Sequence, residues 1–309
     1  MRIPLRYFGL ISAILIVSCI SAGAEEPKAD STLSRSWKKS LNAGLNISQN
    51  SYSDNWIGGE AGNIAWTALV NGTFEKQVSE IFNFRNTSNL QFGQTHQQDK
   101  TTKHWNRPLK SSDKIDLDNL GRFTLHAFVD PFVAFRFQSQ FLDASYDPMK
   151  RMINPILLTE SAGIARMIYQ KDKDQVLSRL GFAFRENLDR AIQGTAADIL
   201  DKKTKLVSTN DGGIESVTDA QYKLASNISY TGKLTIFKAV FFSKKNDFKG
   251  TPAENYWKAI DVNWESTFAA SLTKLITANL YTQVIYDKEI SLKGRFKETF
   301  GLGLTFKLI

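Results

Sequence analysis

Histidine is the residue type on which most catalytic chemistry in this sequence would depend, and the chain has only His96, His104 and His126. Hydrolysis by a Ser-His-Asn set needs a serine that a neighbouring histidine activates, and no serine stands in such a motif beside His126. An Asp–His pair would have to use His96, whose position chance explains better. No glycine-rich phosphate loop or metal-spaced histidine cluster is present. The residues therefore predict no enzyme, no cofactor and no metal site.

One polar stretch has the side chains of a cation site. Residues 208–213 read Ser-Thr-Asn-Asp-Gly-Gly, and Ca²⁺ takes carboxylate and carbonyl oxygens as ligands. A plain loop is the simpler interpretation. The 39 Lys and Arg exceed the 31 Asp and Glu and give a net charge of +8, but the basic residues are scattered. Nucleic-acid proteins carry them in a patch or stripe, so we expect no nucleic-acid partner.

The first residues of the chain predict export from the cytoplasm. Arg2 and Arg6 precede an apolar run, and Ala22-Gly-Ala24 then offers a cleavage site. A lipoprotein box that ends at Cys19 is the competing interpretation. Cleavage after Ala24 lowers the net charge to +6 and removes the only cysteine, so disulfides and Cys-based sites are excluded. We expect a signal peptide over 1–24, a periplasmic extension over 25–35 and a folded domain over 36–309.

From Trp37 onward, apolar side chains recur at every second position. Ile64, Trp66, Ala68 and Val70, for example, alternate with more polar neighbours. A period of two gives a strand with one apolar and one polar face. The pattern predicts about twelve strands, and it leaves the facing of 156–170 and 232–245 open. Their ranges are 36–51, 62–78, 80–98, 113–128, 131–143, 156–170, 174–188, 213–231, 232–245, 255–271, 273–288 and 293–309.

Short and long connections alternate between the predicted strands. Outer-membrane barrels have short periplasmic turns and longer external loops, and an even number of strands would leave both termini on the periplasmic side. The longest connection, 189–212, contains a helix-like stretch over 191–200 that could enter the pore or cap it. The short links lie near 77–80, 129–131, 171–174, 231–232 and 271–273, and the long ones are 52–61, 99–112, 144–155, 189–212, 246–254 and 289–292.

The polar faces of the predicted strands carry many charges. In hydrocarbon every backbone donor and acceptor must be paired internally, and a closed sheet achieves this. A soluble sandwich rarely has strands of about 15 residues with so few breaks. We therefore expect an all-β, antiparallel, up-and-down transmembrane barrel, with its apolar faces toward lipid. The charges predicted to line its lumen are Arg85, Arg122, Arg136, Arg179, Arg185, Asp116, Asp118, Asp261 and Glu265.

Two interpretations of these lumen charges differ in their consequences. Unpaired arginines would focus a positive potential and favour anionic solutes. Arginines paired across strands with Glu75, Asp116, Asp118 and Asp261 would leave the lumen balanced, and this is the interpretation we favour. Aromatic residues are expected at the two membrane interfaces. They are Phe74, Phe82, Tyr230, Phe268 and Phe306 at the periplasmic end, and Trp66, Phe92, Tyr256, Tyr286 and Phe296 at the external end.

The last strand resembles the assembly signal of Gram-negative outer-membrane barrels, which the barrel-assembly machinery recognises. Thr299, Gly301, Leu304 and Phe306 fit its spacing, although Lys307-Leu-Ile309 lacks the usual terminal aromatic residue. Residues 36–145 resemble an uncharacterised family of outer-membrane barrels, of unknown function and best known from Bacteroidetes. That resemblance implies a barrel fold and no catalytic residues. The residues that carry it are Trp37, Leu41-Asn-Ala-Gly-Leu-Asn-Ile-Ser48, Asn55-Trp-Ile-Gly-Gly59, Trp105, Pro108 and Lys114-Ile-Asp116.

These observations favour an integral protein of the Gram-negative outer membrane, with outer-membrane lipid as its surroundings. The first hypothesis is a passive channel for small hydrophilic solutes of unspecified identity. The second is a structural or surface-interaction barrel that uses loops 52–61, 99–112 and 189–212. A membrane-embedded hydrolase is the least favoured of the three.

Overall fold

The computed structural model describes residues 36–52, 61–125, 127–146, 149–172, 174–194, 201 and 203–308. The predicted signal peptide, the predicted extension over 25–35 and His126 lie outside these residues. Most of the predicted loop 52–61 and of the helix-like stretch 191–200 also lies outside them. Among the residues that are described, no helix has the length and apolar composition that crossing a membrane requires.

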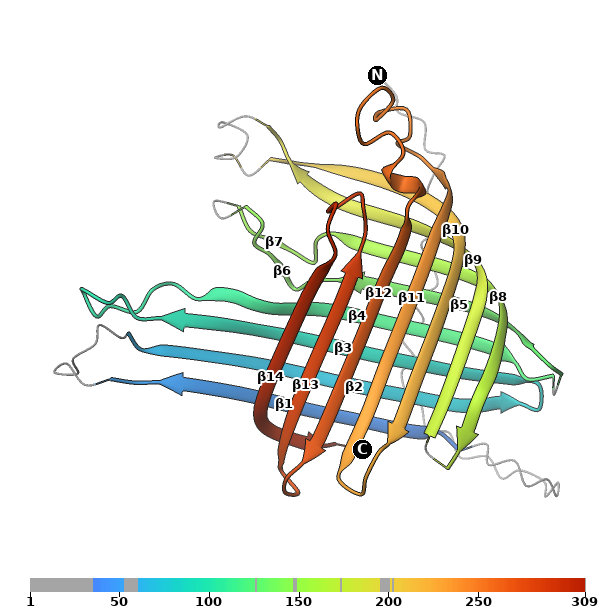
Figure 1. The fold of residues 1–309 in the computed structure, drawn as a ribbon, viewed down its shortest axis with the longest axis horizontal. Helices are drawn as coiled ribbons and strands as arrows, with labels where there is room; N and C mark the ends of the chain where they lie inside the picture. The colour runs from blue at the N-terminus through green and yellow to red at the C-terminus, as the bar shows by residue number, and fades with distance from the viewer. Residues whose placement is uncertain are drawn as a thin grey trace. The chain divides into compact units, whose positions relative to one another are not determined.

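Twelve antiparallel strands form a closed barrel (Figure 1). Each strand pairs with its neighbours in chain order, and β1 pairs with β14 to close the sheet, with Leu45 opposite Leu304. The prediction of an all-β, twelve-stranded up-and-down barrel is therefore confirmed. The barrel strands are β1 (Lys38–Asn50), β2 (Asn63–Ser79), β3 (Phe82–Gln97), β4 (Leu109–Phe123), β5 (Asp130–Ser139), β8 (Ile156–Lys171), β9 (Asp174–Ile192), β10 (Thr204–Lys223), β11 (Ile228–Phe242), β12 (Ile260–Ser271), β13 (Ile276–Tyr286) and β14 (Arg295–Lys307).

The connections differ at the two ends of the barrel. The end that holds both termini of the barrel domain has short connections, and we call it the turn end. The opposite end, the loop end, has longer ones, which include a hairpin of β6 (Leu142–Asp143) and β7 (Arg151–Met152) and the 3-10 helix η1 (Tyr256–Lys258). The turn-end connections are 80–81, 124–129, 172–173, 224–227 and 272–275, and the loop-end connections are 51–62, 98–108, 140–155, 193–203, 243–259 and 287–294.

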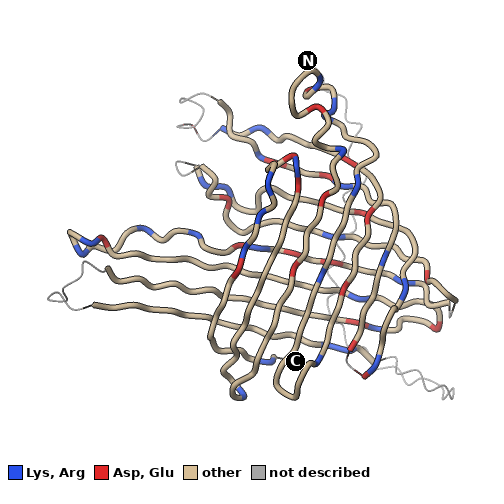
Figure 2. The backbone as a smooth tube through the Cα atoms, in the orientation of Figure 1, with Lys and Arg blue, Asp and Glu red and all other residues tan. Residues whose placement is uncertain are grey.

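The two faces of the barrel wall differ in chemistry. On the outer face, Phe300, Phe296 and Trp264 are 70%, 66% and 49% exposed. The alternate positions of the same strands carry polar and charged residues such as Glu265 and Lys297, and charges recur along the strands as well as at their ends (Figure 2). The strand registers keep one parity beside the same parity of the neighbour, as with Glu265 opposite Lys233 and Gln283.

Outward aromatic rings form a row at the turn end. Tyr169 lies 6.1 Å from Tyr222, Tyr222 lies 6.4 Å from Tyr230, and Tyr230 lies 4.9 Å from Phe268, measured between ring centroids. We call these four residues the turn-end belt. Its members come from β8, β10, β11 and β12, so it follows the barrel wall rather than a single strand.

One predicted turn is wrong. Thr231 and Gly232 lie inside β11, and the turn occupies 224–227, where Ala225 and Ile228 exchange backbone hydrogen bonds of 3.1 and 3.3 Å. Gly232 is explained by its neighbour, because a Cβ atom there would lie 2.5 Å from the Tyr230 hydroxyl oxygen. Gly232 thus makes room for an aromatic side chain within a strand. The predicted loop 189–212 is also wrong in its bounds, because β9 continues to Ile192 and β10 begins at Thr204.

The two strands whose facing the sequence left open both lie at register shifts. The pairing of β8 with β9 shifts between Met167 and Tyr169, and that of β10 with β11 shifts between Gly212 and Gly213. An extra residue at a bulge reverses the parity beyond it. In β11 this makes the consecutive residues Val240 and Phe241 both exposed, whereas Ala239 is buried.

The opposite facing of Ala68 and Asn71 gives a test in a lipid bilayer. Ala68 shares the parity of Trp66 and Val70, whereas Asn71 pairs with Asn42 and Asn89. Ala68→Arg should lower the free energy of unfolding by about 2–4 kcal/mol, because the new charge meets hydrocarbon. Asn71→Arg, on the same strand, should cost much less. Urea titration of protein refolded into vesicles measures both, and equal costs would contradict the facing described here.

Candidate functional site

Side chains from opposite walls of the barrel meet inside it. Lys114 on β4 donates a hydrogen bond to Glu265 on β12. The two strands are six positions apart in either direction around the closed sheet, so this contact has to cross the lumen. Tyr281 on β13 donates its hydroxyl hydrogen to Glu265 over 3.1 Å. The carboxylate of Glu265 is therefore held from both sides of the barrel.

Asp116 on β4 is the most enclosed carboxylate of this region, with an exposed fraction of 2%. Arg136 on β5 grips it with two hydrogen bonds, from Nε at 2.8 Å and from Nη2 at 2.7 Å. Lys114 Nζ lies 3.5 Å from the same carboxylate. The bidentate geometry is the strongest form of an arginine–carboxylate pair, and Lys114 links it to the contact across the lumen.

A second set of ion pairs surrounds Asp118. Arg179 on β9 and Lys233 on β11 approach its carboxylate to 2.9 and 2.6 Å. Arg179 also lies 3.4 Å from Asp219 on β10, and Arg85 on β3 lies 3.3 Å from Asp219. Each cation thus meets carboxylates from strands that are not its sequence neighbours. We call the two sets together the ionic layer: Arg85, Lys114, Asp116, Asp118, Arg136, Arg179, Asp219, Lys233 and Glu265.

Arg185 on β9 organises a separate cluster. It binds both carboxylate oxygens of Asp211 at 2.7 Å and one oxygen of Asp261 at 3.1 Å. Its guanidinium carbon lies 3.5 Å from the centroid of the Phe237 ring, within range of a cation–π interaction. The loop interpretation of residues 208–213 is wrong, because these residues lie within β10. The carboxylate of Asp211 accepts its hydrogen bonds from Arg185. In the described parts of the chain, no group of three or more His, Cys, Asp or Glu residues could hold a metal ion.

The structure pairs three of the five predicted lumen arginines with the expected acids. These are Arg136 with Asp116, Arg179 with Asp118 and Arg185 with Asp261. Arg85 uses Asp219 instead, and Arg122 lies 3.8 Å from Asp130. Glu75 accepts a hydrogen bond from Asn83 at 3.1 Å. Each of these five arginines thus lies within 4 Å of a carboxylate, which favours the balanced interpretation for this set.

The remaining predicted residues lie away from the ionic layer. His96 is in β3, opposite Ile64 of β2, and His104 is exposed in the loop-end connection 98–108. The residues of the assembly-signal resemblance, Thr299, Gly301, Leu304 and Phe306, all lie in β14, the strand that closes the barrel. A Cβ atom at Gly301 would lie 2.7 Å from Nδ2 of Asn46, so a larger residue there would displace the Asn46 side chain of β1.

Apolar side chains also fill parts of the lumen, which the sequence analysis did not predict. Leu120, Phe132, Ala165 and Leu177 form one buried cluster, and Phe132 shares the parity of Arg136 on β5. Ala183, Phe237 and Ala239 form another, and Trp257 of η1 packs against it. Counting parity from a lumen arginine would have identified Phe132. The contact of Trp257 depends on the path of a loop, which no pattern in the strands reports.

The connection 140–155 is fastened to the barrel at both of its sides. Asp113 on β4 accepts backbone hydrogen bonds from Phe141 at 2.7 Å and Leu142 at 2.9 Å. Asn154 donates to Asp143 at 2.9 Å and to Asp189 of β9 at 2.8 Å. Desolvation opposes ionisation of Asp143, but hydrogen bonds from Ser145 and Asn154 and the charge of Arg151 lower the pKa of this carboxyl. The connection therefore has a fixed position at the loop end.

Comparison with known proteins gives a family for part of the chain. Residues 47–145 match the model of a family described as a protein of unknown function, DUF3078. The matched residues cover the end of β1 and all of β2 through β5, and they include Asp116, Asp118 and Arg136 of the ionic layer. No curated protein matches the chain.

Three solved structures with a similar arrangement are distant in sequence. An outer membrane channel from Pseudomonas putida is 11% identical, covers 91% of this chain and 98% of its own, and has a TM-score of 0.40. The translocator domain of the autotransporter NalP from Neisseria meningitidis is 7% identical, with coverages of 87% and 86% and a TM-score of 0.36. The β domain of the Bordetella autotransporter BrkA is 8% identical, with coverages of 88% and 97% and a TM-score of 0.28. No functional residue is transferred from these proteins.

The bidentate pair of the ionic layer predicts a large effect on stability. Arg136→Gln should lower the free energy of unfolding by about 3 kcal/mol or more, because it leaves Asp116 buried without its main partner. The double variant with Asp116→Asn should recover much of that loss. Asp247→Asn, which removes an exposed ion pair with Lys244 in a loop, should cost less than about 1 kcal/mol. Urea unfolding followed by tryptophan fluorescence compares them, and similar costs for Arg136→Gln and Asp247→Asn would refute the assignment.

Proposed function

We propose that the protein is an integral outer-membrane β-barrel that forms a restricted channel for small hydrophilic solutes, with the ionic layer as its narrowest section. The observation that carries the proposal is the contrast between the two faces of the wall. Large apolar side chains are exposed around the outside, whereas the inside holds paired charges. Such an extended apolar surface is unfavourable in water, but it suits hydrocarbon, in which a closed sheet leaves no backbone group unpaired.

The connections suggest the orientation of the barrel. Outer-membrane barrels have short turns on the periplasmic side and longer loops outside. The turn end would then face the periplasm and the loop end the exterior. The turn-end belt supports this arrangement, because tyrosine and phenylalanine rings of barrels gather at the level of the lipid headgroups.

The proposed restriction follows from contacts that cross the lumen. The pair of Lys114 and Glu265 spans the barrel, and Lys297 on β14 lies 3.4 Å from Ser112 on β4. Water and small polar solutes can exchange with such side chains, but a large solute would have to displace them. Because the four acids of the layer balance all but one of its five cations, we expect it to limit size more strongly than it selects by charge.

A surface-interaction barrel is the second candidate function. The observation that favours it is the fixed connection 140–155, since a loop held by Asp113 and Asn154 presents a defined surface at the loop end. Rigid loops lose less conformational entropy on binding. The two functions differ in whether the ionic layer matters, because a surface role does not require solutes to pass it.

Planar-bilayer recording of refolded protein tests the channel. The double variant Lys114→Ala with Glu265→Ala removes the side chains that span the lumen without leaving one of the two charges unpaired. We expect its single-channel conductance to be several-fold higher than that of the wild type, because the narrowest section becomes wider.

The matched control is the double variant Lys244→Ala with Asp247→Ala, which removes an ion pair in the connection 243–259. It should leave the conductance at the wild-type value. Heat-modifiable migration on gels would show that each variant has folded into a barrel. An absence of discrete conductance steps in both the wild type and the widened variant would refute the channel and favour the surface role.

A further inference from the structure

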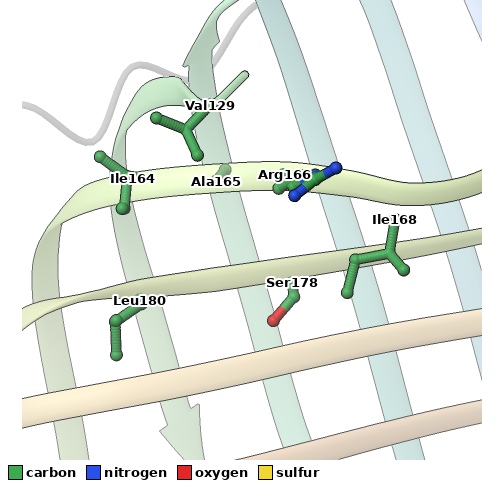
Figure 3. Close-up of a pocket in the computed structure, with 7 residues that line it drawn as sticks. All are labelled: Val129, Ile164, Ala165, Arg166, Ile168, Ser178 and Leu180. Atoms are coloured by element: carbon green, nitrogen blue, oxygen red, sulfur yellow. The ribbon is translucent and has the colours of Figure 1, made fainter.

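A hollow of about 400 Å³ lies on the outer wall near the turn end, where β8 and β9 run beside the connection 124–129 (Figure 3). Binding pockets for small molecules measure roughly 300–1,000 Å³, so the hollow has the size of a ligand site. Most of its lining is apolar, but it includes one charged side chain. The lining residues that matter here are Val129, Ile164, Arg166, Ile168, Ser178 and Leu180.

Arg166 is an exception to the chemistry of the outer face. It shares the outward parity of Ile164 on β8 and lies opposite Ser178 of β9. Its guanidinium carbon lies 3.7 Å from the centroid of the Phe128 ring. In the part of the chain that the structure describes, no carboxylate forms an ion pair with Arg166. The five predicted lumen arginines, by contrast, each lie within 4 Å of a carboxylate. Arg166 therefore keeps an unmatched positive charge on the outside of the barrel.

The level of Arg166 on the wall identifies its surroundings. Tyr169 of the turn-end belt follows it by three residues on β8, and such aromatic belts mark the headgroup region of a membrane. A guanidinium at that level can reach lipid phosphates, which it binds through a pair of parallel hydrogen bonds. The stacked Phe128 ring also fixes its plane, because arginine pairs with aromatic faces by cation–π attraction.

The apolar part of the hollow continues away from the turn end. Ile164 and Leu180 are paired across β8 and β9, one step nearer the middle of the strands than Arg166 and Ser178. Both side chains are exposed, at 46% and 51%. The hollow therefore offers a positive charge at the headgroup level and an apolar surface beside the acyl region. This arrangement is complementary to an anionic phospholipid, which has a negative headgroup and apolar acyl chains.

We propose that this hollow binds one anionic phospholipid of the leaflet at the turn end, with its phosphate on Arg166 and an acyl chain along Ile164 and Leu180. The inference rests on the proposed membrane location and adds a lipid site to it. Selection comes from the headgroup, because all lipid tails are as apolar as leucine and isoleucine side chains. Among the described residues that line the hollow, Arg166 is the one with a charge, and the Ser178 hydroxyl lies 3.0 Å from that of Thr218.

Native mass spectrometry of the refolded full barrel domain tests the site with defined lipids. Detergent-solubilised protein is mixed with equal amounts of phosphatidylglycerol and phosphatidylcholine, and the retained lipid is counted. The wild type should retain phosphatidylglycerol several-fold over phosphatidylcholine in a complex of one lipid per barrel. Arg166→Gln should bring that ratio close to one, and Arg166→Lys should give an intermediate value, since lysine keeps the charge and loses the paired hydrogen bonds.

Lys76→Gln is the matched control. Lys76 is another turn-end cation with an aromatic partner, 5.8 Å from the centroid of the Trp37 ring, but it does not line the hollow. The Lys76→Gln variant should retain the wild-type ratio of the two lipids. Wild-type protein in excess inorganic phosphate should also retain it, because a free phosphate lacks the acyl contact. An equal ratio for Arg166→Gln and the wild type overturns the lipid site, as does full displacement by phosphate. Vesicle insertion is measured separately, so a barrel that inserts without lipid preference contradicts this site alone, and one that fails to insert contradicts the membrane proposal.

Discussion

Closure of the sheet between β1 and β14 is the constraint on which the rest of the structure depends. Once Leu45 lies opposite Leu304, every strand has two neighbours and no edge remains. A wall that is one sheet thick has only an outer and an inner face, and successive residues must alternate between them. A charged side chain of a strand that does not point outward therefore points into the lumen, which all the strands of the barrel share.

The ionic layer follows from that geometry. Asp116 and Asp118 would be costly if left alone inside the wall, since a buried unpaired charge is strongly unfavourable. Their cationic partners lie on several strands around the barrel. Arg136 on the next strand pairs with Asp116, and Arg179 on β9 and Lys233 on β11 pair with Asp118. The lumen is thus held together by contacts around and across the ring, in addition to the backbone ladder. Outside the ring, no described carboxylate forms an ion pair with Arg166, so in the proposed site its charge is available to a ligand.

The sequence predicts the strands well because alternation is a local property, repeated over ten or more residues in each barrel strand. It fails where a neighbour in space decides. Gly232 suggests a turn until its proximity to the Tyr230 hydroxyl is known, and the polar residues 208–213 suggest a loop until Asp211 is seen to bind Arg185. Register shifts in β8 and β11 hide the facing of both strands. The predicted charges could be assigned to a face, but the contact between Lys114 and Glu265 joins residues 151 positions apart, and no local pattern specifies it.

The composition of the lumen also bears on its role. A barrel that serves only as a scaffold could be filled with apolar side chains, and Leu120, Phe132 and Leu177 show that this chain fills part of its interior in that way. Replacing a buried ion-pair network by well-packed apolar residues is often neutral or stabilising, so stability alone does not account for the charges. Charged side chains differ from apolar ones in that water and polar solutes can compete for them. An interior closed by Lys114 and Glu265 can therefore open to a hydrated path, whereas one closed by leucine and phenylalanine would have to break its packing first.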